Sequence, residues 1–118
     1  MKAEQLKLLV IDALEDIKAE DITVLDVTGM TDVTDVMIIA TGKSTRQVKA
    51  LANEVSAQAK AAGVQPLGME GEDIGEWALV VLGDVIAHIM TPQTRAIYNL
   101  EKLWSVAEVT QSASADGE

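Results

Sequence analysis

The chain has 118 residues, no cysteine, one histidine, and a formal charge of −10 from 19 acidic and 9 basic side chains. These totals exclude disulfides, thiolate catalysis and metal sites built from several cysteine or histidine ligands. They predict one domain that is large enough to bury a core without cross-links, and so acidic a protein is poorly suited to binding phosphate backbones.

The first half of the chain predicts two helices separated by two strands. Apolar residues recur with helical or alternating spacing in four segments, at 3–18, 22–27, 36–40 and 45–62. The third segment is apolar on both faces, which is typical of a central strand. Ser44 is the predicted N-cap of the second helix, and Gly63 suits the position just after its end.

The second half predicts three strands and a final helix. The segments are 64–70, 77–82 and 85–90 for the strands, and Pro92 to about Trp104 for the helix. Pro66 indicates that the first of these strands is an edge strand or a bulge. Gly83-Asp84 suits a two-residue type II′ hairpin turn between the other two. Small polar residues predict a disordered tail at 105–118, after a domain that spans 1–104.

This hairpin has two different faces because side chains alternate along each strand. One face, called the Trp77 face below, carries Trp77, Leu79, Val81, Ile86, His88 and Met90. The other, called the aliphatic face, carries Ala78, Val80, Leu82, Val85, Ala87 and Ile89. The aliphatic face is expected to be core. The Trp77 face suits either a second buried layer or a recognition surface.

The element order predicts an α/β fold, a mixed five-stranded β-sheet packed with α-helices in a single domain.

Charged residues are distributed unevenly along the chain. No Lys or Arg occurs from Ala61 to Thr94, where five acidic residues occur, namely Glu70, Glu72, Asp73, Glu76 and Asp84. This block would attract a basic protein surface, although an acidic surface that only aids solubility is the simpler explanation.

Two motifs could carry chemistry. Gly42-Lys43-Ser44 resembles the end of a phosphate-binding loop, but Met37 stands where that motif needs glycine, so helix capping is the better explanation. The loop carboxylates come without a basic phosphate clamp or a nucleotide loop, which argues against metal-dependent phosphoryl transfer.

Other binding modes are also weakly supported. Arg46, Lys49 and Lys60 of the second helix could touch RNA, but three such charges more often form a solvated face. No apolar run reaches the roughly 18 residues of a membrane helix, and the start of the chain is too acidic for a signal peptide. We expect a soluble cytoplasmic protein with no cofactor, no membrane partner and no direct sequence-specific contact with nucleic acid.

Several short blocks of residues occur along the chain in an order that is typical of one protein family. They are Ala19–Ile22 with Leu25–Val27, Thr34–Asp35, Thr41–Gly42 with Ser44–Val48, Pro66–Gly68 with Glu70–Gly71, Trp77, Gly83–Val85 with His88, and Arg95, Tyr98, Leu100–Glu101 and Leu103–Trp104. Together, these blocks closely resemble the ribosomal silencing factor (RsfS/Iojap) family. The resemblance covers nearly everything from the first helix to Trp104.

The resemblance implies a translation repressor that is not an enzyme, with a nucleotidyltransferase-like fold that lacks the catalytic motif. Members of this family bind the large ribosomal subunit through a basic ribosomal protein at the subunit interface (large-subunit protein fourteen). While bound, they sterically block association with the small subunit, so translation falls under starvation or in stationary phase. A homodimer off the ribosome is implied as well.

The resemblance moves the expectation for the Trp77 face from core towards contact. The expected partner-binding residues are Glu70, Trp77, Leu82, His88, Met90, Arg95 and Tyr98. Trp77 is the expected anchor, because Trp, Tyr and Arg anchor interfaces most often, and Glu70 is expected to pair with a Lys or Arg of the partner. No catalytic, cofactor-binding or metal-binding residue is expected.

Two rival functions remain open. The first is a large-subunit assembly factor that uses the same surface, which immature large subunits after gene deletion would favour. The second is a divergent nucleotidyltransferase-like enzyme, which a required metal or hydrolysis of a nucleotide would favour.

Overall fold

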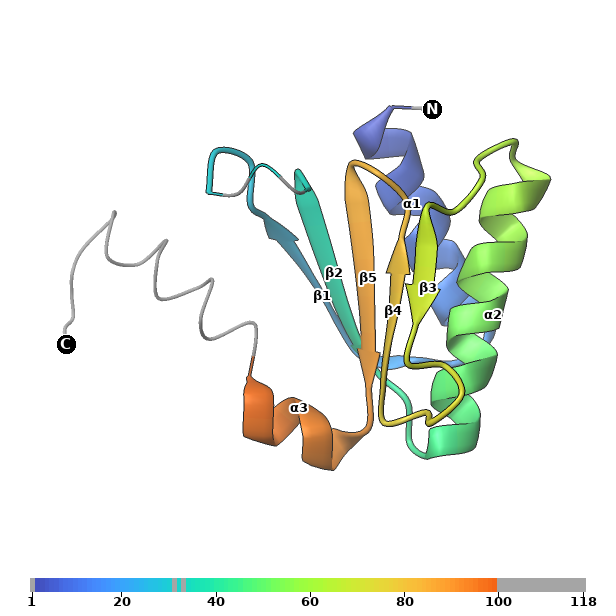
Figure 1. The fold of residues 1–118 in the computed structure, drawn as a ribbon, viewed down its shortest axis with the longest axis vertical. Coiled ribbons are helices and arrows are strands. Elements are labelled where there is room, and N and C mark those ends of the chain that lie inside the picture. Colours follow the sequence, from blue (N-terminus) through green and yellow to red (C-terminus); the bar gives the residue numbers. More distant parts are fainter. Residues whose placement is uncertain (1, 31, 33, 100–118) are drawn as a thin grey trace, which may run out of the picture.

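Five strands form one mixed sheet, with two long helices on one side of it and a short helix at its end (Figure 1). The structure, a computed structural model, describes residues 2–30, 32 and 34–99. Its elements are α1 (Ala3–Asp16), β1 (Glu20–Asp26), β2 (Val36–Thr41), α2 (Thr45–Ala61), β3 (Gly68–Glu70), β4 (Trp77–Val81), β5 (Val85–Met90) and α3 (Pro92–Tyr98).

The strand order is β1-β2-β5-β4-β3, in which β2 and β5 run parallel and the other neighbours are antiparallel. The predicted mixed five-stranded sheet and the predicted order of elements are therefore confirmed, and β3 is an edge strand as expected. The predicted helix end near Trp104 and the predicted polar tail at 105–118 lie outside the described residues.

The β4–β5 hairpin has the predicted register. Its five cross-strand pairs run from Trp77 opposite Met90 to Val81 opposite Ile86. Gly83 has a φ of +89°, which the first central position of a type II′ turn requires and which glycine adopts without steric cost. The Trp77 face and the aliphatic face therefore carry the residues assigned to them from the sequence.

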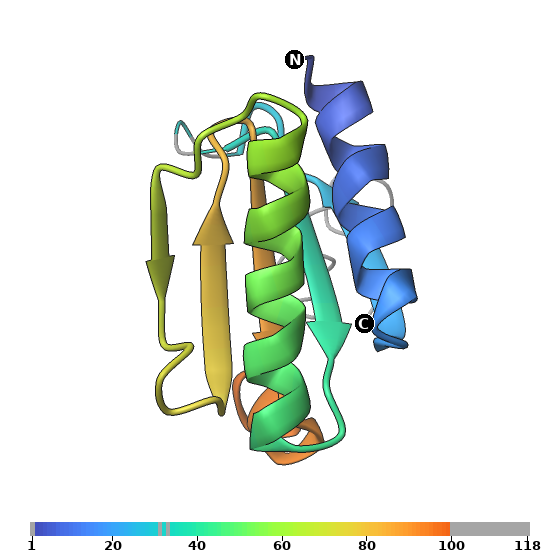
Figure 2. The same ribbon diagram turned by 90° about the vertical axis from the view of Figure 1, so that its right-hand side faces the viewer.

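The helices α1 and α2 lie side by side and cover the aliphatic face of the hairpin (Figure 2). Their buried stripes are Leu6, Val10, Ala13 and Leu14 on α1, and Val48, Leu51, Ala52, Val55, Ser56 and Ala59 on α2. The apolar side chains of these stripes form the main core together with Ile38 of β2 and the aliphatic face. Burial of an aliphatic side chain contributes about 1.5–3 kcal/mol, so this layer is the main source of stability.

Left-handed backbone shapes the connection between α1 and β1. Lys18 has a φ of +62° and Asp21 a φ of +50°. The helix α1 therefore ends at Asp16, two residues before the predicted end, because left-handed backbone cannot continue a right-handed helix. The pairing of β1 with β2 shifts register between Glu20 and Thr23, which is a bulge around Asp21.

The segment before α2 caps the helix, as predicted. Ser44 Oγ accepts a hydrogen bond from the Gln47 N–H over 3.2 Å. Lys43 forms an ion pair with Glu20 at 3.3 Å, so its ammonium is engaged by a carboxylate. A Cβ on Gly42 would lie 2.8 Å from Val48 Cγ2, so tight packing requires this glycine.

Candidate partner-binding surface

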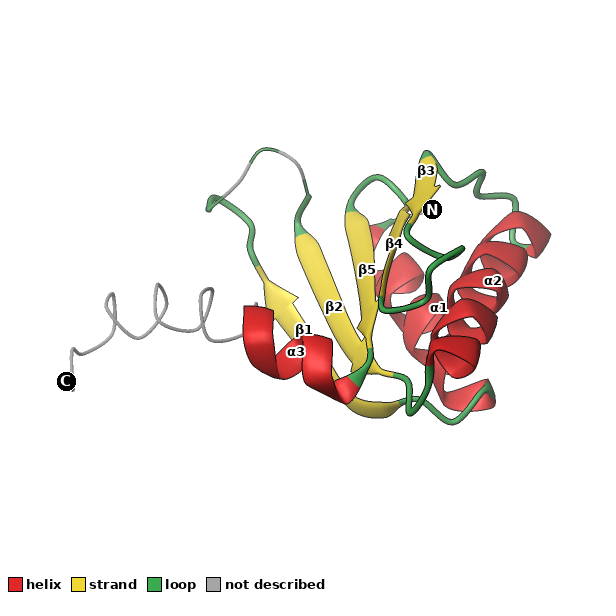
Figure 3. Cartoon of the chain, turned by 60° about the horizontal axis from the view of Figure 1, so that its bottom comes forward, coloured by secondary structure: helices red, strands yellow, loops and turns green. Residues whose placement is uncertain are grey.

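The Trp77 face is the more open side of the sheet. Among the described residues, α1 and α2 lie on one side of the sheet and α3 on the other (Figure 3). The end of α3 reaches the Trp77 face through Tyr98, whose ring lies against Trp77. Leu79, Val81 and His88 are half-buried, and Tyr98 is 58% exposed. An apolar sheet surface that is not covered by a helix is typical of a binding site.

Trp77 lies where β4, β5 and α3 meet. Its Nε1–H donates a hydrogen bond to His88 Nδ1 over 3.1 Å. Its ring centroid lies 6.0 Å from that of His88 and 4.7 Å from that of Tyr98. It also packs against a second, smaller apolar cluster, which consists of Leu25, Val27, Met37, Ile39 and Met90. Trp77 is thus half-buried, with a fixed environment on the side that faces the protein.

His88 is neutral at physiological pH. Burial lowers the pKa of His88 from 6.5 to about 4. Nδ1 accepts the hydrogen bond from Trp77 and therefore carries no proton, so the proton of the neutral ring is on Nε2. The only histidine of the chain adds no positive charge to the Trp77 face.

A hollow of about 220 Å³ opens beside Trp77. It is lined by Glu70, Gly71, Trp77, Leu79 and His88. Gly71 has a φ of +78°, and a Cβ there would collide with the carbonyl oxygen of Trp77, so only glycine lets the chain pass this close to Trp77. Apolar walls beside one carboxylate suit a long side chain of a partner.

Acidic residues occur beside this hollow, in the loop between β3 and β4, and in the hairpin turn, and this set is called the acidic rim below. It consists of Glu70, Glu72, Asp73, Glu76 and Asp84, of which all but Glu72 are exposed. The ion pairs found in the described part of the chain join Lys7 to Glu4 and Lys43 to Glu20, so neither pair involves a carboxylate of the rim. Such a rim attracts and steers a basic surface.

Two residues that were expected at the surface are buried. Leu82 is 5% exposed, because strand alternation places it on the aliphatic face under the helices. The turn beyond it is held down, since Asp84 O accepts a hydrogen bond from Thr34 Oγ1 over 2.8 Å. Met90 is 0% exposed, because it pairs with Trp77 and lies in the second apolar cluster. The expectation that these two side chains contact a partner directly is wrong for this structure.

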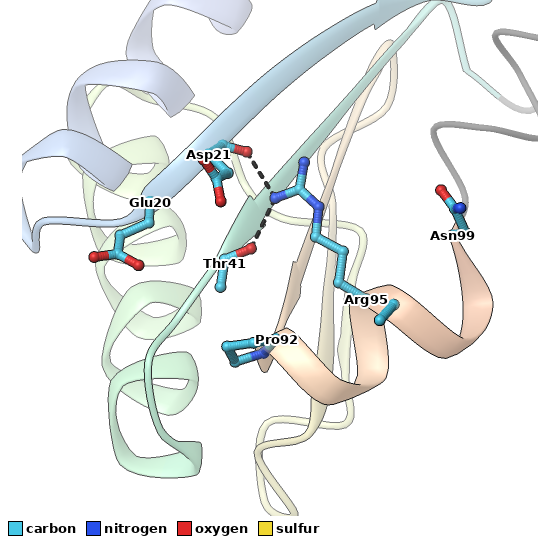
Figure 4. A pocket seen from close by; sticks show the side chains of 7 residues that line it. Glu20, Asp21, Thr41, Pro92, Arg95 and Asn99 are labelled. Atoms are coloured by element: carbon cyan, nitrogen blue, oxygen red, sulfur yellow. Dashed lines mark hydrogen bonds between the residues drawn. The ribbon is translucent and has the colours of Figure 1, made fainter.

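Arg95 supports α3 from within the fold (Figure 4). Its Nη1 donates to Asp21 O over 2.6 Å and to Thr41 Oγ1 over 2.8 Å, and its Nη2 donates to Thr23 Oγ1 over 3.0 Å. These bonds tie α3 to one end of β1 and β2, beside an open hollow of about 480 Å³. The guanidinium therefore positions the helix that carries Tyr98, and a direct contact of Arg95 with a partner stays a prediction.

Two surface residues escaped the sequence-based list of contacts. Ile97 is 76% exposed beside Tyr98, and α3 has no buried residue. The sequence signal for Ile97 is an apolar side chain in a short helix. Because α3 has no buried face, the helical pattern does not show which of its side chains point outward. Leu79 lines the hollow only because β3 pairs with β4, a pairing that the sequence pattern does not specify.

Neither a metal-binding cluster nor a membrane-spanning helix is found among the described residues. Across residues 2–30, 32 and 34–99, no three or more acidic or histidine side chains are grouped as a metal ion would require. None of the helices in that part of the chain is both long enough and apolar enough to cross a membrane. Aromatic anchors, an apolar hollow and an acidic rim suit a basic protein partner.

Known proteins resemble this chain in both sequence and fold. A family described as "Ribosomal silencing factor during starvation" matches residues 1–118. The ribosomal silencing factor RsfS of Chromobacterium violaceum is 50% identical over 104 residues, which cover 88% of this chain and 85% of that protein. A crystal structure of a Chromobacterium violaceum protein matches with a TM-score of 0.87 at 50% identity, covering 89% of this chain and 88% of that one.

A more distant relative comes from mouse and is named "Mitochondrial assembly of ribosomal large subunit protein 1". It is 32% identical over 101 residues, which cover 83% of this chain and 44% of the mouse protein.

Proposed function

Because this chain belongs to the ribosomal silencing factor family, we propose that it represses translation by covering the surface of the large ribosomal subunit on which the small subunit docks. The chain is a ribosome-associated regulator and not an enzyme. In this proposal, the Trp77 face binds a basic ribosomal protein at the subunit interface, large-subunit protein fourteen. The bound chain then excludes the small subunit sterically under starvation or in stationary phase.

The observation that carries this proposal is the combination of an open apolar face on the β4–β5 hairpin with acidic residues in its turn and in the loop before it. Trp77 and Tyr98 lie in ring contact at 4.7 Å, which gives the face an aromatic centre of the kind that dominates binding energy at interfaces. The exposed carboxylate of Glu70 lines the hollow beside them. The aromatic pair supports affinity, and the acidic rim supports rapid association with a cationic partner.

Light scattering of purified ribosomal subunits tests the proposal. Large subunits are incubated with the protein before small subunits are added, and the rise in scattering reports joining. We expect the wild-type protein to suppress that rise. Trp77→Ala should restore joining, because loss of an anchor of this type weakens binding by about 2 kcal/mol or more, which is roughly 30-fold.

Two controls make the result decisive. Far-ultraviolet circular dichroism establishes that Trp77→Ala is folded, and co-sedimentation establishes whether each protein binds the large subunit. Normal joining in the presence of bound wild-type protein would contradict steric exclusion. An unfolded Trp77→Ala variant would show that Trp77 acts in the core rather than at the contact surface.

A second candidate function is assembly of the large subunit through the same surface. The name of the mouse relative favours it, although that protein is more than twice as long as the part that matches this chain. Sucrose-gradient profiles of a deletion strain separate the two functions. Immature large subunits would support assembly, whereas normal subunits that join too readily in starved cells would support repression.

A further inference from the structure

Trp77 is held by groups from three different elements. The indole N–H donates to His88 of β5 over 3.1 Å, and the Tyr98 ring of α3 lies 4.7 Å from the indole at an interplanar angle of 48°. Leu79, and not Trp77, is the direct partner of His88 across the hairpin. Trp77 and His88 are therefore diagonal neighbours on one face, a separation that large aromatic side chains can bridge.

The hydrogen bond fixes the chemical form of His88. A nitrogen that accepts from the indole cannot carry a proton, so the ring is neutral with its proton on Nε2. Burial lowers the pKa of His88 to about 4, which favours the same form. The residues around the ring are consistent with this, because its neighbours Leu79 of β4 and Ile39 of β2 are apolar.

The titratable groups on the neighbouring elements do not compete with Trp77 for the imidazole of His88. Glu70 of β3 lines the same hollow as His88, and the ring of Tyr98 of α3 packs against Trp77. Neither makes a hydrogen bond to the imidazole within the described part of the chain, where Trp77 is the partner of Nδ1.

We propose that His88 is a positioning residue, which holds the indole of Trp77 in one orientation as a neutral hydrogen-bond acceptor, so that the contact surface is formed before the partner arrives. This inference rests on the proposed function. A tryptophan that is already ordered loses less side-chain freedom on binding, and the expected gain is roughly two- to tenfold in affinity. His88 acts in this account through Trp77 and makes no essential contact with the partner.

Three substitutions separate this role from a direct contact. His88→Asn places an amide oxygen close to the position of Nδ1 and removes the Nε2 donor. His88→Gln places its amide close to the position of Nε2 and removes the Nδ1 acceptor. His88→Leu removes both. If His88 acts through Trp77, His88→Asn should bind purified large subunits within about twofold of wild type, while His88→Gln and His88→Leu weaken binding by roughly two- to tenfold.

The opposite pattern, in which His88→Gln binds normally and His88→Asn does not, would overturn the inference in favour of a direct contact through Nε2. Equal binding by wild type and His88→Leu would also overturn it. Failure of the proposed function gives a different result, since either neither the wild type nor any variant would bind large subunits, or the bound wild-type protein would leave subunit joining unchanged. Urea unfolding of each variant separates loss of binding from loss of the fold.

A second measurement needs no ribosome. The chain has one histidine, so its ring nitrogen signals in a ¹⁵N NMR spectrum belong to His88 alone. At about pH 7 we expect an unprotonated Nδ1, a protonated Nε2, and a slowly exchanging indole N–H of Trp77. Trp77→Phe should leave the ring neutral and remove that indole signal. A proton on Nδ1, or an indole N–H that exchanges as fast as in an unfolded chain, would overturn the positioning role.

Near-ultraviolet circular dichroism adds a readout of the indole itself. In a Trp104→Phe background, Trp77 is the single tryptophan. His88→Leu should reduce its signal and His88→Asn should retain it. A signal that does not differ between these two variants would contradict a specific orientation set by His88.

Discussion

The two faces of the β4–β5 hairpin are made by alternate residues of the same two strands, yet they differ in burial. Residues of the aliphatic face are between 0% and 5% exposed. On the Trp77 face, Ile86 and Met90 are also buried, but Trp77, Leu79, Val81 and His88 are only half-buried. Both faces are largely apolar, so hydrophobicity does not separate core from contact surface. The difference is that α1 and α2 lie over the aliphatic face.

The side chains on the two faces also suit different tasks. The aliphatic face offers small and branched side chains, which interdigitate with the apolar stripes of two helices. The Trp77 face offers an aromatic pair, a hydrogen-bonded histidine and a neighbouring carboxylate. Large rings with polar atoms provide binding energy and direction when a partner covers them. One hairpin therefore contributes both to the core of the fold and to the candidate contact surface.

The largest expected effect is a loss of stability from the aliphatic face. Ile89→Ala should lower the free energy of unfolding by about 2–5 kcal/mol, because Ile89 is 0% exposed and its removal leaves a cavity under the helices. Leu79→Ala on the opposite face should cost only about 1 kcal/mol, since Leu79 is half-buried. Urea unfolding followed by circular dichroism measures both, and equal losses would contradict the difference between the faces.

A smaller effect is expected from acid, and it should arise on the Trp77 face. The pKa of His88 is about 4 in the folded chain because of burial, against 6.5 for the ordinary side chain. Between these values, the unfolded chain binds a proton that the folded chain does not, so the free energy of unfolding falls as the pH is lowered through this window. Above about pH 7, His88 is neutral in both the folded and the unfolded chain, so it contributes no pH dependence to the free energy of unfolding there.

His88→Asn serves as the control for this acid effect, because it removes the titrating group. The wild type should lose more stability than the variant between about pH 6.5 and pH 4 in urea unfolding experiments. Asp26 does not interfere, since hydrogen bonds from Thr28 lower the pKa of Asp26 below 3.8 and its contribution is lost only at lower pH. Parallel pH profiles for the two proteins would show that His88 is not kept neutral by the fold.

The smallest expected effect concerns the rate of association. Glu70→Lys should slow binding to large subunits several-fold at low salt, and the effect should shrink as salt is added. Glu15→Lys on α1 is the matched control, because it makes the same charge change at an exposed position on the helix side of the sheet. Equal slowing by both variants would mean that net charge alone, and not the acidic rim, steers association.

Much of the fold could be predicted from local sequence. The Gly83-Asp84 turn and the alternation along the strands were enough to give the hairpin register residue by residue, because a two-residue turn leaves one pairing. Ser44 likewise marked the start of α2, since a cap acts on the N–H groups next to it. Such features depend on neighbours in the chain and need no knowledge of tertiary structure.

Parts of the candidate surface could not be predicted in this way. Leu82 and Met90 were expected at the surface, yet their burial depends on helices and strands that pack on them from distant parts of the sequence. Arg95 bonds to groups 74, 54 and 72 positions away, which no local pattern reveals. Sequence reasoning predicted which residues share the Trp77 face, whereas only the fold separates its accessible side chains from its buried ones.

The most direct test of the central claim compares two exposed apolar side chains on opposite sides of the sheet. Tyr98, which packs on Trp77, is 58% exposed, and Leu8 on α1 is 53% exposed. The affinity of Tyr98→Ala and of Leu8→Ala for purified large subunits is measured at one salt concentration. The account predicts a loss of roughly tenfold or more for Tyr98→Ala and no change beyond about twofold for Leu8→Ala. Equal affinities for the two variants, or a larger loss for Leu8→Ala, would contradict the assignment of the Trp77 face as the contact surface.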